Sequence, residues 1–289
     1  MTRVLVLGAS GMLGTMVARV LASNSALEVV ASTRQGAGAA LAFDADRDSI
    51  PELLDSARCD WIINAIGILD RRIDEADPVS VAAAIEVNAT LPNRLVAAAG
   101  RRRRVIHISS DGVFSGRTAP YDERAPRDAD SVYALSKSLG EVRSANVVNL
   151  RCSIIGRDEH PAKSLLGWAV SLPPGATITG YTNHHWNGVT TYHLAKLCAA
   201  VILSDIHDLP NLLHIVPGDA VSKAELLQLI LSAFGRGDVN VVAESAPVPV
   251  DRTLGTVYPE VNQRLWGAAG HPTPPTIQEM VNELSTLGQ

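Results

Sequence analysis

Residues 3–14 read RVLVLGASGMLG, an apolar run that turns through three glycines into a second apolar segment. The run predicts a buried strand, and the segment after Gly11 predicts a helix. The free N–H groups and positive dipole end of that helix would face the end of the strand and form an anion-binding site. Gly8 permits the tight turn, Gly11 admits a phosphate close to the backbone, and Gly14 lets helix and strand pack closely. The stretch therefore predicts a dinucleotide pyrophosphate site, although a tight turn without ligand can carry the same glycines.

Composition narrows the class of protein. The 289 residues are 46% hydrophobic with a net charge of −5, so we expect a main domain with a smaller one attached and no nucleic-acid partner. The start leads directly into the first strand, and no apolar run approaches the roughly 18 residues that span a membrane. We therefore expect a soluble cytoplasmic protein with no membrane partner. The widely spaced Cys59, Cys152 and Cys198 favour buried reduced thiols, and the histidines show no metal-binding spacing, so we expect no metal.

Strand and helix patterns alternate through the first half of the chain. After the first strand, strands are expected at residues 27–32, 39–43, 60–67, 105–110 and 145–151, with one long helix over residues 78–99. This alternation predicts an α/β fold, a doubly wound parallel sheet of the Rossmann type, whose ligands lie beyond the carboxyl ends of the strands.

The alternation weakens after Gly156. Short strands are expected near Thr177 and Val189, with a strand at 212–216 and helices at 191–203, 222–234 and 276–287. We expect residues 1–155 to form an NADP-binding Rossmann domain, with a returning segment at about 186–216. Residues 156–289 would form mainly a smaller, interleaved α/β substrate-binding domain.

The end of the second strand, Thr33-Arg34, bears on the choice of cofactor. An acidic residue there would bind the adenosine ribose of NAD, whereas an arginine accommodates the 2′-phosphate of NADP. Arg34 therefore favours NADPH, unless it is only a solvated residue of the glycine-rich loop that follows. Asp44 could contact adenine or cap the next helix. The expected cofactor-binding residues are Gly8, Ser10, Gly11, Met12, Leu13, Gly14, Thr33, Arg34, Asp44, Ala45, Ala65, Ile66, Gly67 and Lys137.

Tyr133 and Lys137 are four residues apart and share one helix face. A lysine ammonium beside a phenol favours the phenolate, so we expect the pKa of Tyr133 to be lowered from about 10 toward neutral pH. Ser110, at the end of the fifth strand, could hold a carbonyl oxygen while hydride arrives from a nicotinamide. The same spacing recurs in Tyr192 and Lys196, but no hydroxyl-ended strand lies shortly before them. Tyr133 is therefore the expected catalytic tyrosine, and Tyr192 a packing or substrate contact.

Several motifs together resemble the extended short-chain dehydrogenase/reductase family. They are the glycine turn at 8–14, NAIG at 64–67, SSDGVFSG at 109–116, and Tyr133-x-x-x-Lys137-x-x-Gly140-Glu141. Within that family, the 109–116 loop and VSKAEL at 221–226 are most similar to dTDP-4-dehydrorhamnose reductases. Those reductases usually carry a tyrosine where this chain has Gly112, so an aromatic that could shape the sugar pocket is absent.

The resemblance implies an NADPH-dependent reduction of a 4-keto-6-deoxy sugar on a nucleotide carrier. It also implies the roles of three residues: Tyr133 protonates the keto oxygen, Lys137 binds the nicotinamide ribose and tunes Tyr133, and Ser110 orients the carbonyl. The expected partner is the nucleotide-sugar substrate, and a homodimer stays open. Candidate substrate contacts, each of which also fits an ordinary surface or packing role, are Lys163, Asn183, Trp186 and Arg252.

Two other functions fit the same motifs. A nucleotide-sugar epimerase or dehydratase would keep NAD bound and return the hydride to its product, and Arg34 argues against it. A non-catalytic regulatory subunit would bind NADP or a sugar nucleotide without turnover. The intact set of Ser110, Tyr133 and Lys137 argues against that reading.

Overall fold

The computed structural model describes residues 1–158, 164–204 and 209–287. Its main sheet has seven strands, all parallel, in the order β11-β6-β5-β4-β1-β2-β3. The strand order reverses between β1 and β4, which is where doubly wound sheets bind their ligands. The predicted fold class is therefore confirmed. The strands are β1 (Thr2–Leu7), β2 (Leu27–Thr33), β3 (Leu41–Ala42), β4 (Trp61–Asn64), β5 (Arg104–Ile108), β6 (Val147–Arg151) and β11 (Leu212–His214).

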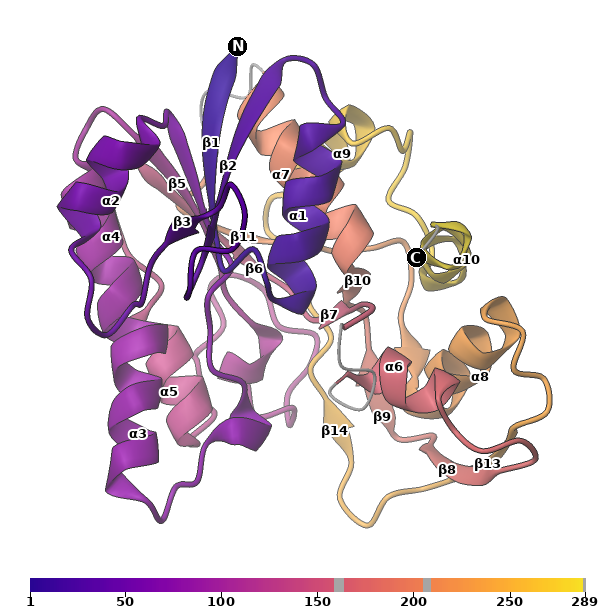
Figure 1. Ribbon diagram of the computed structural model, residues 1–289. Coiled ribbons are helices and arrows are strands. Elements are labelled where there is room, and N and C mark those ends of the chain that lie inside the picture. Colours follow the sequence, from indigo (N-terminus) through magenta and orange to yellow (C-terminus); the bar gives the residue numbers. More distant parts are fainter. Residues whose placement is uncertain (159–163, 205–208, 288–289) are drawn as a thin grey trace.

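Helices cover both faces of this sheet (Figure 1). Helices α1 (Met12–Ala22) and α7 (Thr191–Leu203) lie against one face, and α2 (Ile50–Ala57) and α4 (Leu91–Ala99) lie against the other. Successive side chains of a strand point to opposite faces, so Val4 and Val6 enter the first core while Leu5 and Leu7 enter the second. A strand that is buried on both faces needs an unbroken apolar run, which explains the sequence of β1.

The helical stretch predicted over residues 78–99 contains an irregularity. It consists of α3 (Pro78–Ile85), a π-helical turn η2 (Glu86–Thr90) and α4. Pro92 has no N–H to donate to the carbonyl of Asn88, which removes one α-helical hydrogen bond at this point. The Asn88 side chain instead accepts from the N–H of Ile68 and donates to its carbonyl, each at 2.9 Å. The helix is thereby joined to the loop that follows β4.

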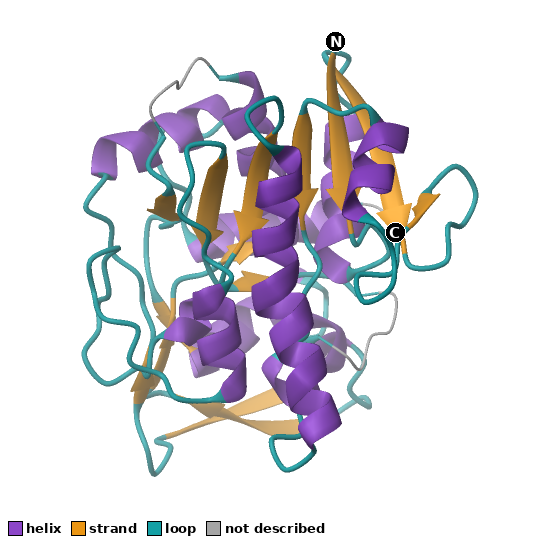
Figure 2. Cartoon of the chain, turned by 90° about the vertical axis from the view of Figure 1, so that its left-hand side faces the viewer, coloured by secondary structure: helices purple, strands orange, loops and turns teal. Residues whose placement is uncertain are grey.

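The second half of the chain adds small sheets and further helices. Figure 2 shows the main sheet in the upper part of the molecule, with shorter strands below it. The small sheets pair β7 (Ile154–Ile155) with β10 (Val189–Thr190), β8 (Thr177–Tyr181) with β13 (Asn240–Glu244), and β9 (His184–Trp186) with both β12 (Val221–Ser222) and β14 (Val250–Asp251). The helices are α5 (Val132–Leu139), α6 (Leu165–Val170), α8 (Lys223–Ala233), α9 (Pro259–Ala268) and α10 (Ile277–Thr286), with 3₁₀ turns η1 (Asp70–Arg72) and η3 (Asp111–Val113).

Several predicted bounds differ from the structure. The third strand is only Leu41–Ala42, because Gly36 and Gly38 have positive φ and hold the preceding residues in a turn. The predicted helix at residues 191–203 is α7, and the strand predicted at 212–216 contributes β11 to the edge of the main sheet.

The cysteines are buried and free. Within the described ranges, no helix is both long enough and apolar enough to cross a membrane.

Candidate active site

The glycine turn has the geometry that an anion-binding site requires. Gly8 has a φ of 77°, and a Cβ on Gly14 would lie 2.1 Å from the Gly8 carbonyl oxygen, so a side chain at position 14 would separate strand from helix. Gly11 is the N-cap of α1 and offers no side-chain cap, and the first turn holds no acidic residue. The backbone donors of that turn are therefore available to a negatively charged group.

A cavity of about 710 Å³ opens beside this turn, at the carboxyl ends of the parallel strands. This volume is in the range of small-molecule and cofactor sites. The cavity is lined by the N-terminus of α1, by the segments after β4, β5 and β6, and by α5. It brings together these predicted site residues: Ser10, Gly11, Met12, Leu13, Ala65, Ile66, Gly67, Ser110, Tyr133 and Lys137.

The other predicted cofactor residues lie outside the cavity lining. Gly8 and Gly14 form the turn behind it, whereas Thr33, Arg34, Asp44 and Ala45 lie toward the β2–β3 edge of the sheet. Arg34 is exposed, and the Thr33 hydroxyl accepts a hydrogen bond from the N–H of Gly36 at 3.1 Å. Thr33 therefore shapes the loop that carries Arg34.

The interpretation of Asp44 as a helix cap is wrong. Ser49 caps α2 by accepting a hydrogen bond from the N–H of Glu52 at 3.4 Å. Asp44 instead accepts from the N–H of Asp46 at 3.2 Å, so it stabilises a turn that begins six residues before the helix.

Ser110 and Tyr133 approach the cavity from two different elements. Ser110 follows β5 and accepts a hydrogen bond from the N–H of Gly112 at 3.0 Å. Tyr133 lies in the first turn of α5, where Ser131 caps the helix by accepting from the N–H of Ala134 at 3.2 Å. Both hydroxyl groups are thus placed by capped, hydrogen-bonded backbone rather than by free loops.

The pKa of Tyr133 differs from the expectation. Burial raises it to about 12, the charges of Asp111 and Asp70 add to the rise, and a hydrogen bond with Ser110 opposes it. The predicted lowering of this pKa is therefore wrong, and the Lys137 ammonium donates a hydrogen bond to the Ile108 carbonyl at 2.7 Å. Burial lowers the pKa of Lys137 to about 8, and the Glu141 carboxylate opposes that shift. Tyr133 therefore retains its proton at neutral pH.

Glu141 is the centre of a buried polar network behind the cavity. Its carboxylate accepts from the Ser109 hydroxyl at 2.6 Å, from two nitrogens of Arg151 at 2.8 and 2.6 Å, and from Arg127 at 2.9 Å. The two charged partners Glu141 and Arg151 are almost completely buried. These hydrogen bonds lower the pKa of Glu141 against the effect of burial and hold the ends of β5, β6 and α5 together.

Much of the cavity wall consists of residues that were not predicted from the sequence. Most of the missed residues follow the carboxyl end of a parallel strand, so the rule that placed the site could have found them. One of them, Asp111, is ionisable: burial raises its pKa, while the charges of Arg252 and Lys223 lower it. The missed residues are Ile68, Leu69, Arg71, Arg72, Ile108, Ser109, Asp111, Cys152, Ser153, Ile154, Ile155, Asp158, Ser164 and Leu165.

The candidate substrate contacts have mixed positions. Lys163 lies outside the described residues. Asn183 exchanges two hydrogen bonds of 2.8 Å with the backbone of Ala246, which is a structural role. Trp186 donates to the hydroxyl of Ser153, a cavity residue, at 2.8 Å. Lys196 lies over the ring of Tyr192, with its Nζ 5.4 Å from the ring centre and outside the cavity lining.

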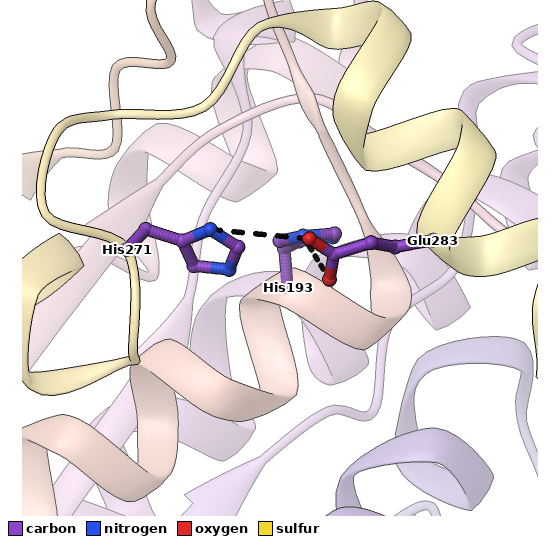
Figure 3. Close-up of side chains that lie close together, drawn as sticks. All are labelled: His193, His271 and Glu283. Carbon is purple, nitrogen blue, oxygen red and sulfur yellow. Dashed lines mark ion pairs between the residues drawn. The ribbon is translucent and has the colours of Figure 1, made fainter.

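One group of potential metal ligands occurs within the described ranges, away from the cavity. Figure 3 shows His193 from α7, His271 from the segment after α9, and Glu283 from α10 turned toward one another. The Nε2 of His193 lies 3.3 Å from the Glu283 carboxylate, and Nε2 of His271 lies 2.9 Å from the Lys196 ammonium nitrogen. The other ring nitrogen of His271, Nδ1, lies 4.0 Å from the Glu283 carboxylate. The absence of a metal site stays a prediction.

The comparison with known families agrees with this architecture. Residues 1–285 match the model of the family described as RmlD substrate binding domain. The chain belongs to the RmlD substrate binding domain family. The match covers both halves of the chain and is consistent with the resemblance to extended short-chain dehydrogenases/reductases.

Two curated relatives are similar to about half of the chain. One is the spore coat polysaccharide biosynthesis protein SpsK of Bacillus subtilis (strain 168), 32% identical over 145 residues, which are 49% of this chain and 47% of the relative. The other is a dTDP-4-dehydrorhamnose reductase of Aggregatibacter actinomycetemcomitans, 32% identical over 147 residues, 49% of this chain and 46% of the relative. The chain thus spans about half the length of the curated relatives that it matches.

Solved structures of other proteins share the fold over most of the chain. A dTDP-4-dehydrorhamnose reductase from Bacillus anthracis in complex with NADP has a TM-score of 0.77 at 19% identity, covering 98% of this chain and 99% of that one. A hypothetical dTDP-4-dehydrorhamnose reductase from Sulfolobus tokodaii has a TM-score of 0.70 at 24% identity, covering 88% and 92%. At these identities the likeness establishes the fold.

Proposed function

We propose that this protein is an NADPH-dependent oxidoreductase that reduces the keto group of a nucleotide-linked 4-keto-6-deoxy sugar, as dTDP-4-dehydrorhamnose reductases do. The observation that carries the proposal is the single cavity in which Ser110, Tyr133 and Lys137 face the anion-binding end of α1. In this proposal residues 1–155 bind the cofactor and residues 156–289 bind mainly the sugar nucleotide. The names of the curated relatives support this substrate class and a role in polysaccharide biosynthesis.

The residues of the cavity supply the acid and the orientation that such a reduction needs. Bound NADPH would supply the hydride that adds to the carbonyl carbon. Tyr133 donates its proton to the carbonyl oxygen, which completes the alcohol, and its raised pKa keeps that proton available at neutral pH. Ser110 donates a hydrogen bond that orients the same oxygen. Lys137 contributes a positive charge beside them.

The choice of NADPH rests on Arg34 and on a fold neighbour described in complex with NADP. Arg34 follows β2 and carries an exposed guanidinium that fits a 2′-phosphate. Arg34→Asp should raise the Kd for NADPH by at least tenfold, since one lost charge-assisted contact is worth about 1.5–3 kcal/mol, and should leave NADH binding nearly unchanged. Arg101 is exposed in the turn before β5, at the amino ends of the parallel strands, so Arg101→Asp makes the same charge change away from the cavity and should affect neither. Equal losses for both cofactors would reject the 2′-phosphate contact.

The activity is tested with purified protein, NADPH and a panel of dTDP-, UDP- and GDP-linked 4-keto-6-deoxy sugars, followed by NADPH oxidation. Tyr133→Phe should lower kcat by about 10²–10⁴-fold, because it removes the general acid. Tyr192→Phe, the matched change in the second tyrosine-lysine pair, should leave kcat unchanged. No oxidation with any sugar would remove the reductase proposal, and equal rates for Tyr133→Phe and wild type would place the chemistry elsewhere.

A further inference from the structure

A hydroxyl group in the cavity wall, that of Ser153, has no part in the proposed proton transfer. Ser153 lies two residues beyond β6, lines the cavity and is partly exposed. Its hydroxyl oxygen accepts a hydrogen bond of 2.8 Å from the indole Nε1 of Trp186. Among the residues that the structure describes, this hydroxyl makes no other hydrogen bond. Since a serine hydroxyl also carries one proton to donate, Ser153 can donate to a ligand in the cavity.

The segment of residues 186–189 holds Ser153 at two points. Trp186 binds its hydroxyl, and the N–H of Val189 donates to its carbonyl oxygen at 2.9 Å. A Cβ on Gly188 would collide with the Ser153 backbone and with the Trp186 ring, so the two segments are in direct contact. The backbone of Ser153 is therefore fixed, and the hydrogen bond from the indole fixes its side chain.

Trp186 is itself held by the part of the chain that is proposed to bind the sugar nucleotide. It is 4% exposed, it is the last residue of β9, and its backbone pairs with Val221 of β12. The ammonium nitrogen of Lys223, the first residue of α8, lies 5.6 Å from the centre of its ring. Because buried side chains are closely packed, the indole keeps one orientation toward Ser153.

The connections of Ser153 indicate which ligand it contacts. The turn before α1 forms the proposed pyrophosphate site, whereas Ser153 is bound by residues from the half proposed to hold the sugar nucleotide. Strands β5 and β6 are neighbours, with Ile108 opposite Leu150, so Ser110 and Ser153 follow adjacent strands at the same edge of the sheet. The two hydroxyls therefore face the same sugar, Ser110 at its keto oxygen and Ser153 at another oxygen.

We infer that Ser153 is a substrate contact that donates a hydrogen bond to a hydroxyl oxygen of the sugar, and that Trp186 is the positioning residue that directs it. The inference rests on the proposed function. Loss of one neutral hydrogen bond corresponds to a change in affinity of about 3- to 10-fold. The contact holds the sugar without taking part in proton transfer, so its loss should raise KM and leave kcat nearly unchanged.

The test measures KM and kcat for the sugar nucleotide with Ser153→Ala and with Trp186→Phe, which removes the indole N–H and keeps an aromatic ring. Each change should raise KM about 3- to 10-fold, with kcat within about threefold and the Kd for NADPH within about twofold of wild type. In the Ser153→Ala background, Trp186→Phe should change KM less than about twofold, because the hydroxyl that it directs is absent.

Trp168→Phe is the matched control, since it removes an indole at an exposed position of α6 and should leave KM unchanged. Equal effects of Trp186→Phe on KM in both backgrounds would overturn the positioning role. An unchanged KM for Ser153→Ala, or a higher Kd for NADPH in place of a higher KM, would overturn the sugar contact.

Binding without turnover separates this contact from the reaction. Calorimetric titration of the NADP⁺ complex with dTDP-rhamnose and with dTDP alone distinguishes a contact to the sugar from a contact to the nucleotide. Ser153→Ala should weaken binding of dTDP-rhamnose about 3- to 10-fold and change binding of dTDP less than about twofold. Equal weakening of both ligands, or a wild type that binds dTDP-rhamnose no more tightly than dTDP, would reject the contact. If the expected difference is found and no sugar is reduced, the proposed function fails while the contact stands.

The hydrogen bond between the two side chains has a spectroscopic signature. The chain has four tryptophans, so Trp186→Phe identifies the Trp186 signal in an NMR spectrum of the indole N–H groups. Ser153→Ala should shift this signal more than the signals of the other tryptophans, because it removes the acceptor of the indole N–H. Addition of dTDP-rhamnose should shift the same signal in the wild type. A Trp186 signal that does not move in Ser153→Ala would exclude the positioning role.

Discussion

At the scale of single residues, the pKa of Lys137 predicts how the proposed activity depends on pH. Burial lowers this pKa to about 8, so the ammonium is present below pH 8 and is lost above it. The kcat/KM for reduction should be constant from pH 6 to 7.5 and fall up to tenfold per unit above pH 8, since this ratio reports ionisations of the free enzyme. Lys196→Met should retain the inflection. A profile that stays flat to pH 10 would contradict the assignment to Lys137.

Single residues also show which features of the candidate site can be predicted from the sequence and which cannot. The spacing of Tyr133 and Lys137 and the hydroxyl after the fifth strand placed three side chains that the structure brings to one cavity. The sign predicted for the Tyr133 pKa shift, a lowering, is wrong. That sign depends on how deeply the phenol is buried and on the Ile108 carbonyl that binds Lys137, and both arise from packing between distant segments.

At the scale of elements, the π-helical turn η2 predicts a link between stability and the cavity. Asn88 in this turn bonds both backbone groups of Ile68, a cavity residue, and donates to the Ser136 hydroxyl of α5 at 3.3 Å. Asn88→Asp keeps the shape and turns the amide donor into an acceptor that faces the Ile68 carbonyl. The free energy of unfolding should fall by about 1–3 kcal/mol, measured by urea denaturation. Asn240→Asp, at an exposed strand position, is the control. Equal stabilities of the two variants would exclude this role.

The prediction of helices and strands succeeded where the apolar pattern extends over many residues. The apolar run of β1 and the 13-residue helix α7 carry enough residues for their patterns to be unambiguous. Strands β12 and β14 have two residues each, too few for any alternation, and they exist because a neighbouring strand, β9, supplies their hydrogen-bond partners. The Asn88 side chain in the π turn finds its partner in Ile68, 20 residues away in the sequence, which no local pattern indicates.

At the scale of the whole molecule, the cluster of His193, His271 and Glu283 predicts loss of stability in acid. Burial, His271 and Lys196 lower the pKa of His193 to about 3, below the 6.5 of an exposed histidine. The unfolded chain therefore binds a proton below pH 6.5 that the folded chain does not take up until about pH 3. From pH 6.5 to 5, wild type should lose about 1–2 kcal/mol more unfolding free energy than His193→Gln.

Urea denaturation at several pH values measures that difference. The control is His185→Gln, which changes an exposed histidine and should retain the pH dependence of wild type. Parallel curves for wild type and His193→Gln would show that another group is responsible. Since the cluster joins α7 to α10 and to the segment before it, this proton reports the packing of residues as far apart in the sequence as His193 and Glu283.

The position of β11 limits how parts of this chain can be exchanged with parts of a relative. This strand extends the main sheet beside β6, and α7 packs against α1, so residues from beyond position 190 complete the layers around the glycine turn. A single cut after residue 155 would expose the edge of β6 and the apolar side of α1. The two halves of the chain therefore cannot be exchanged with those of a relative as separate units. A hybrid that imports the sugar-binding part of a relative needs several crossovers, with α7 and β11 kept beside the helix and strand they cover.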